Sequence, residues 1–136
     1  MIAFFDASAL IYLIESKEPF SGRVRRGFSS LVARNARLGS AVSRLTLLEC
    51  RVGPVKNNDA ALLASFDAFF ARRDLFWVEL TKDVVELATL IRVKHGLRTP
   101  DALQAAACLQ LGPDHIFLTG DAAFRRVSGL MVKVFA

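Results

Sequence analysis

Hydrophobic and polar positions divide the chain into two kinds of segment. Short, continuous apolar runs alternate with longer stretches in which apolar residues recur at helical spacing. A short continuous run is typical of a strand buried on both faces, whereas a repeat near 3.6 residues indicates a helix with one face on a core. The apolar runs predict five strands, over residues 2–5, 38–42, 75–80, 115–119 and 131–135.

The stretches between these runs predict helices with recognisable ends. Ser43 is a suitable cap for the third helix, Gly53-Pro54 is expected to break the chain after it, and Thr99 is expected to cap the sixth. We expect helices over residues 7–16, 21–37, 44–51, 59–73, 81–95 and 99–111, and a short one over 121–127.

Strands that alternate with helices form βαβ units, and these units build a parallel sheet with helices on both faces. We therefore expect an α/β fold: an α/β/α sandwich around a five-stranded, mostly parallel sheet. A chain of 136 residues buries enough surface to fold without a metal or a disulfide, so residues 1–136 are expected to form a single domain.

Composition narrows the class of protein. Hydrophobic residues make up 53% of the chain, yet no apolar run is long enough to span a membrane, and no signal-peptide pattern is present. Cys50 and Cys108 lie in apolar surroundings without C-x-x-C spacing, which favours buried free thiols and a cytoplasmic location. The net charge of +5 favours a polyanionic partner such as nucleic acid.

Two acids follow apolar runs directly. Asp6 ends the first run, and Asp121 ends the fourth, in IFLTGD. The carboxyl ends of parallel strands share one edge of a sheet, where ligands bind in α/β folds, so the two carboxylates meet there if their strands are neighbours. The plain alternative for Asp6 is a helix cap, a role that aspartate performs well.

Two further acids lie near the ends of predicted helices. Glu49 stands among core-type residues in LTLLEC, and Asp101 lies in the first turn of the sixth helix, where its alternative role is to complement the helix dipole. If these acids converge with Asp6 and Asp121, their repulsion calls for a cation, and carboxylate and water ligands suit Mg²⁺ or Mn²⁺. Zinc fits poorly, because the chain has only two histidines and no cysteine pair at ligand spacing.

The stretches FFDASAL, LTLLEC, RTPDALQAAA and FLTGDAAF resemble, in order, the four motif regions of PIN-domain nucleases. They are most similar to those of VapC-type toxins of toxin–antitoxin systems. The resemblance implies a PIN-like fold with a five-stranded parallel sheet, Mg²⁺ or Mn²⁺ in an acidic pocket, and endoribonuclease activity. It also implies a homodimer, and a cognate antitoxin whose C-terminal segment occupies the groove. Matched position by position, the catalytic and metal-binding acids are Asp6, Glu49, Asp101 and Asp121, each binding directly or through water.

The chain also departs from the family pattern. The family often has Thr-Asn-Asp and a further acid before the Phe, whereas this chain has Thr119-Gly120-Asp121 and Ala123, which leaves open whether one metal ion or two would bind. Thr119 and Ser8 are expected to support the site by orienting a carboxylate or a metal-bound water. A phosphatase of the haloacid dehalogenase type would need an acid at position 8.

The expected reaction is metal-assisted hydrolysis of an RNA phosphodiester. The alternative is a catalytically inactive PIN-like module that binds RNA or another partner, and the presence of all four acids speaks against it. Several arginines are available for RNA phosphates, although an ordinary solvated surface explains them equally well: Arg23, Arg25, Arg26, Arg44, Arg51, Arg72 and Arg73.

Overall fold

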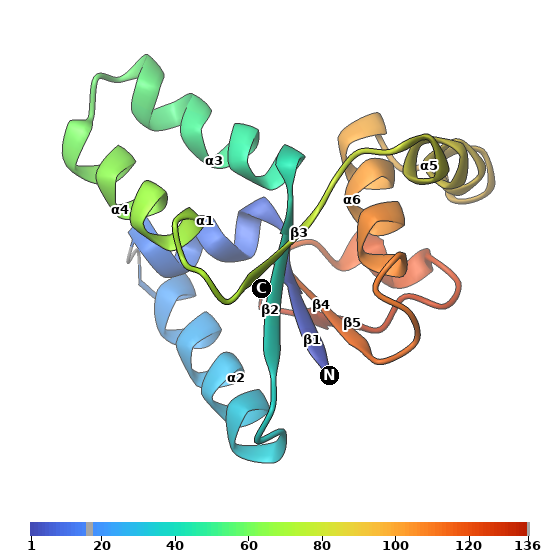
Figure 1. Cartoon of the computed structure of the whole chain (residues 1–136), viewed down its shortest axis with the longest axis horizontal. Helices are drawn as coiled ribbons and strands as arrows, with labels where there is room; N and C mark the ends of the chain where they lie inside the picture. The colour runs from blue at the N-terminus through green and yellow to red at the C-terminus, as the bar shows by residue number, and fades with distance from the viewer. Residues whose placement is uncertain (16–17, 136) are drawn as a thin grey trace.

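The computed structural model describes residues 1–15 and 18–135 (Figure 1). A five-stranded sheet runs through the middle in the order β3-β2-β1-β4-β5, and every neighbouring pair is parallel. The predicted strands are all present, with ends that differ by at most two residues. They are β1 (Ile2–Phe5), β2 (Gly39–Ser43), β3 (Leu75–Val78), β4 (His115–Thr119) and β5 (Val132–Val134).

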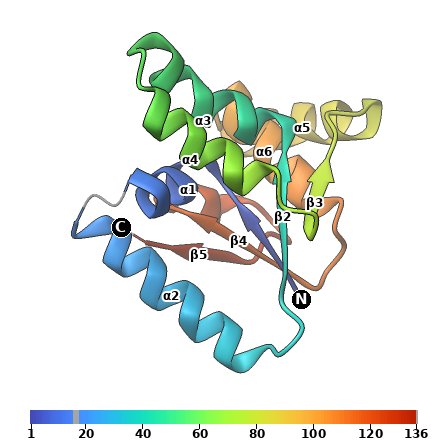
Figure 2. The same cartoon turned by 60° about the vertical axis from the view of Figure 1, so that its left-hand side comes forward.

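Helices cover both faces of the sheet (Figures 1 and 2), which confirms the predicted sandwich. One face carries α1 (Ala7–Glu15), α2 (Phe20–Arg34), α3 (Arg44–Lys56) and α4 (Ala60–Phe70). The other carries α5 (Lys82–His95), α6 (Thr99–Leu109) and the 3₁₀ helix η1 (Ala122–Arg126). The predicted end of the first helix, Ser16, lies outside the described residues.

Each face of the sheet has its own apolar core, because successive side chains of a strand point to opposite faces. Phe4 of β1 stacks on Phe117 of β4, with ring centroids 5.5 Å apart, in the core beneath α5 and α6. Phe5 belongs to the core on the other face, where Phe66 of α4 is fully buried. The aromatic residues of the fourth helix therefore fill a core.

The chain order places β1 at the switch point of the sheet. The chain passes from β1 to β2 on one side, and later returns to β4 on the other side of β1. The register pairs Ile2 with His115 and Phe5 with Leu118, so β1 and β4 end side by side. The strands that end before Asp6 and Asp121 are therefore neighbours, which meets the condition under which these acids share one edge of the sheet.

The prediction that the helix breaks at Gly53-Pro54 is wrong, because both residues lie within α3. Proline disfavours a helical residue before it through a clash with that residue's Cβ, and Gly53 has no Cβ. Pro54 lacks an N–H to donate, but its ring is buried, and its carbonyl accepts the Asp59 N–H at 2.9 Å. The helix therefore continues to Lys56. Its start is as predicted: Ser43 and Thr46 form a reciprocal capping box.

The prediction that Thr99 caps the sixth helix is also wrong. Thr99 is the first helical residue of α6, and Arg98 takes the cap position without a side-chain hydrogen bond to the helix. Pro100 stands in the first turn, where its missing N–H costs nothing. The shift by one residue keeps Asp101 in the first turn of α6, as predicted.

Two compositional expectations concern the environment of the protein. Cys50 and Cys108 are both buried and free, as expected. No helix within the described ranges is long and apolar enough to cross a membrane. The cytoplasmic location stays a prediction.

Candidate functional site

Asp6 lies directly after β1 with only 7% of its surface exposed. Its Oδ1 accepts the Ala7 N–H at 2.9 Å, and its Oδ2 accepts the Ser8 hydroxyl at 3.0 Å and the Thr119 hydroxyl at 2.8 Å. A capping aspartate accepts from the second or third residue of its helix, whereas the backbone bond here comes from the first. Asp6 is thus a buried carboxylate held by hydroxyl groups.

Burial raises the pKa of the Asp6 carboxyl above its ordinary value. The hydrogen bonds from Thr119, Ser8 and Ala7 lower the pKa in turn, and repulsion by the Asp101 carboxylate raises it slightly further. The net direction is upward, so the charged form of Asp6 is disfavoured in the protein without a cation.

The end of β4 is tied to the same hydroxyl groups. The Gly120 N–H donates to Ser8 Oγ at 2.9 Å, and the Asp121 N–H donates to Thr119 Oγ1 at 3.1 Å. The two hydroxyl oxygens are 3.3 Å apart. These bonds join the ends of β1 and β4 into one network, in which the hydroxyl groups of Ser8 and Thr119 both donate to Asp6. Their supporting role in a catalytic site stays a prediction.

Asp121 lies at the exposed rim of this network. Its Oδ1 accepts the Ala123 N–H at 2.9 Å and so caps η1. Its backbone is linked to Asp6 through the Thr119 hydroxyl. In the structure, the Asp121 carboxylate stabilises the turn after β4 by accepting this backbone hydrogen bond.

Glu49 and Asp101 approach Asp6 from two different helices. Glu49 lies partly buried on α3, and its pKa is raised first by burial and then by repulsion from Asp6 and Asp101. Asp101 lies partly buried on α6, where Arg98 Nε is 3.3 Å from its Oδ2. Asp6, Glu49 and Asp101 therefore act on one another electrostatically, although they are far apart in the sequence.

Gln104 is a site neighbour that the sequence analysis missed. It is fully buried, accepts a hydrogen bond from the Ser43 hydroxyl, and donates to Thr46 Oγ1 at 2.9 Å. It also lowers the pKa of Glu49. Its signal in the sequence is a single amide in the otherwise apolar run ALQAAAC, on the helix that carries Asp101.

The donor chemistry of the site fits a hard divalent cation, because its accessible ligands are carboxylate oxygens. The carboxylates of Asp6, Glu49 and Asp101 repel one another, and a divalent cation bound among them would reduce this repulsion. Among the residues that the structure describes, no three or more His, Cys, Asp or Glu side chains stand in a metal-holding arrangement. The four acids as a ligand set therefore stay a prediction.

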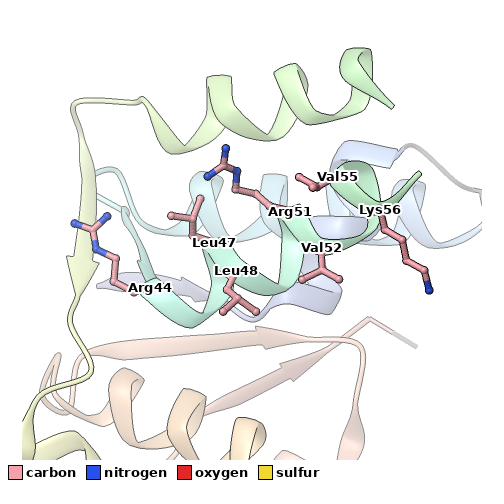
Figure 3. Close-up of a pocket in the computed structure, with 7 residues that line it drawn as sticks. All are labelled: Arg44, Leu47, Leu48, Arg51, Val52, Val55 and Lys56. Carbon is pink, nitrogen blue, oxygen red and sulfur yellow. The ribbon is translucent and has the colours of Figure 1, made fainter. Parts of the chain in front are cut away.

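A groove of about 630 Å³ lies along α3, and its lining includes none of the four acids (Figure 3). Its floor is apolar and includes the exposed side chains of Leu48 and Val52, which project to the same side of the helix in Figure 3. We call it the α3 groove; it is lined by Arg44, Leu47, Leu48, Arg51, Val52, Val55 and Lys56.

Several arginines considered for RNA phosphates interact with other groups of the chain, Arg23 and Arg25 among them. Arg44 also stacks on the Trp77 ring, with its guanidinium carbon 4.0 Å from the ring centroid. The ion pairs are Arg44 with Glu79, Arg51 with Asp67 and Arg72 with Asp74.

Comparison with known proteins agrees with this geometry. The family model for the PIN domain matches residues 3–130, so the chain belongs to the PIN domain family. This confirms the family that the motifs indicate. No curated protein sequence matches the chain.

Solved structures share the fold over nearly the whole chain. VapBC2 from Rickettsia felis, bound to a DNA fragment from its promoter, is similar at a TM-score of 0.77 and 17% identity over 100% of both chains. DNA-bound VapBC from Salmonella typhimurium gives 0.75 and 18% over 100% of this chain and 99% of its own. VapC20 from Mycobacterium tuberculosis, a toxin that cleaves the sarcin–ricin loop, gives 0.71 and 17% over 90% and 92%. The resemblance to VapC-type toxins is thus confirmed at the level of the fold.

The burial of Asp6 leads to a prediction about metal-free stability. Because the folded-state pKa of Asp6 is raised, the stability that its protonated form contributes is fully present below the ordinary value of 3.8. It is lost as pH rises through the raised value. We expect Asp6→Asn to melt at the same temperature as wild type or higher, at pH 7 in EDTA. This advantage should shrink as the pH falls toward 4, and differential scanning calorimetry across this range measures it.

Asp74→Asn is the control for this experiment, because Arg72 lowers the pKa of that exposed carboxyl. Removing its charge should bring no gain in melting temperature at pH 7. If Asp6→Asn melts below wild type at pH 7 in EDTA, the hydrogen bonds to Asp6 outweigh its burial, and our account of the site is wrong.

Proposed function

We propose that the protein is a metal-dependent endoribonuclease, the toxin component of a VapBC-type toxin–antitoxin system. The observation that carries the proposal is the mutual electrostatic influence of Asp6, Glu49 and Asp101 at the carboxyl edge of a PIN-domain sheet. Buried and half-buried carboxylates that repel one another are costly to a fold, and their presence at a ligand-binding edge points to a cation.

Asp6, Glu49, Asp101 and Asp121 are the residues that would hold Mg²⁺ or Mn²⁺, directly or through water. The cation would supply a water molecule of lowered pKa and positive charge against the scissile phosphate. The hydroxyl groups of Ser8 and Thr119 fix the orientation of Asp6, and the low exposure of Asp6 keeps competing water away from it. Gln104 lowers the pKa of Glu49 and so favours its charged form. Hydrogen bonds with Ser43 and Thr46 hold the Gln104 amide in place.

The alternative function is a catalytically inactive PIN-like module that binds RNA or another partner. It needs neither raised carboxyl pKa values nor the hydroxyl groups that hold Asp6. The two functions differ in one measurable property, because only the nuclease needs the cation for turnover.

We expect cleavage of single-stranded RNA to require Mg²⁺ or Mn²⁺ and to stop in excess EDTA. Asp6→Asn and Asp121→Asn each remove a charge from the proposed ligand set and should lower the cleavage rate by about 100-fold or more. Gel analysis of labelled RNA measures the rate. Asp74→Asn, which changes a carboxylate paired with Arg72, is the matched control and should leave the rate unchanged. Undiminished cleavage in EDTA would exclude the metal mechanism, and no cleavage under any condition would favour the inactive module.

The proposed partner is a cognate antitoxin, since several similar structures are toxin–antitoxin complexes by their descriptions. A basic side chain of its tail would enter the carboxylate site, where opposite charge is worth most. The α3 groove lies on the same helix as Glu49, and its apolar floor would cover the hydrophobic part of the tail.

We expect a saturating amount of the antitoxin to abolish RNA cleavage by the wild-type protein. Leu48→Glu should weaken the complex and restore cleavage at antitoxin concentrations that silence wild type, because it places a charge on the apolar floor of the groove. Titration of the cleavage rate with antitoxin measures both effects. Full cleavage by the saturated wild-type complex would contradict the proposal.

The proposed assembly is a homodimer. Two large aliphatic residues one turn apart on α5 are exposed, Leu90 by 67% and Val93 by 81%, and a second molecule that covers them would remove this apolar surface from water. We expect Leu90→Glu and Val93→Glu together to reduce the molar mass from two chains to one, with little change in melting temperature. Light scattering after gel filtration measures the mass. A wild-type mass of one chain at micromolar concentration would exclude the dimer.

A further inference from the structure

Two aromatic rings stack at the junction of α1 and α2. The rings of Tyr12 and Phe20 lie 4.7 Å apart between centroids and 19° from parallel. Phe20 is 37% exposed, and Tyr12 is only partly buried. The guanidinium carbon of Arg23 lies 5.9 Å from the centroid of the Phe20 ring. We call Tyr12 and Phe20 the aromatic step.

The aromatic step borders the carboxylate site through Gly120. A Cβ atom built on Gly120 would lie 2.6 Å from Cε2 of Tyr12 and 3.2 Å from its hydroxyl oxygen. Gly120 is the residue between Thr119 and Asp121, and its N–H donates to the Ser8 hydroxyl that holds Asp6. The Tyr12 ring therefore occupies the volume that a side chain at position 120 would fill, one residue away from Asp121.

Packing of α1 on α2 accounts for the stack only in part. Phe5 and Phe66, which fill the core on this face of the sheet, are almost completely buried, whereas Phe20 keeps more than a third of its surface in solvent. An exposed ring with a guanidinium over it is the arrangement on which proteins stack the bases of single strands. Tyr12 lies against Gly120, the residue before Asp121, so a base stacked there would lie beside the proposed catalytic site.

We propose that Tyr12, Phe20 and Arg23 form a subsite for one nucleotide of single-stranded RNA beside the scissile phosphate. Tyr12 already covers one face of the Phe20 ring, and the Arg23 guanidinium lies over the ring. The base therefore takes the place of Arg23 on the exposed part of Phe20, and the guanidinium turns to a backbone phosphate. Stacking tolerates any base, so the subsite sets the position of the strand and not its sequence. This inference rests on the proposed ribonuclease function and adds to it the place where the substrate is held.

The test uses the full chain in EDTA, so that binding is measured without cleavage. The probes are a fluorescent single-stranded oligoribonucleotide and a strand of the same length without bases, and fluorescence anisotropy gives Kd. Tyr12→Leu and Phe20→Leu should each weaken binding of the base-containing strand by roughly 5- to 100-fold. Neither should change binding of the strand without bases. Tyr12→Phe keeps the ring and should stay within about twofold of wild type.

Arg23→Gln should weaken both strands equally and reduce the salt dependence of binding, because it removes a phosphate contact. Phe76→Leu is the matched control, since Phe76 is an exposed ring on β3, at the edge of the sheet. It should leave both Kd values unchanged. If Tyr12→Leu fails to fold, Phe20→Leu still tests the proposal, because Phe20 lies at the exposed start of α2.

The outcomes separate the subsite from the proposed function. Wild type that binds and cleaves RNA, with Leu variants that bind both strands as wild type does, would overturn the subsite and leave the nuclease standing. Equal weakening of both strands by the Leu variants would also overturn it, because the rings would then act only through the packing of α1 on α2. Wild type that neither binds RNA nor cleaves it with Mn²⁺ would overturn both.

Discussion

The rest of the site depends on the buried carboxylate of Asp6. A carboxylate at the end of a buried strand loses hydration, and the structure compensates with hydroxyl groups from two places in the sequence, Ser8 and Thr119. Thr119 reaches Asp6 only because β4 lies beside β1 in parallel register. The sheet order, the ends of two strands and the orientation of the carboxylate are therefore parts of a single arrangement.

The compensation at Asp6 is incomplete. Burial still outweighs the three hydrogen bonds, and Glu49 and Asp101 add negative charge from α3 and α6. The chain as a whole carries a net charge of +5, so its outer field attracts a polyanion while its ligand-binding edge repels one. The proposed divalent cation would resolve the conflict, because it would neutralise the carboxylates at the place where a substrate phosphate would approach.

Local pattern was enough to predict the sheet and to place Asp6 and Asp121 after strand ends, whereas the strand order that makes those strands neighbours came from the structure. Short apolar runs fix the strands, and the positions of the acids after two of them fix where those acids lie. The errors came where two local effects compete. Gly53 removes the clash that normally ends a helix before proline, so the expected break after α3 is absent.

The contribution of Gln104 could not be predicted from a local pattern either. Its partners Ser43 and Thr46 lie about sixty positions earlier in the chain and come near only when α6 packs over the end of β2. The same reason applies to Asp121: sequence places it at the strand end, but its bond to the Ala123 N–H depends on the path of the following turn.

The contact between Tyr12 and Gly120 has a consequence for how the site varies among related chains. The Tyr12 ring and a side chain at position 120 compete for one volume, so a large residue at one position excludes a large residue at the other. An asparagine at position 120 of this chain would therefore require a smaller residue, or a different rotamer, at the position of Tyr12. The two positions are 108 residues apart in the chain, yet their side chains share one volume, so a substitution at position 120 calls for a compensating change at position 12.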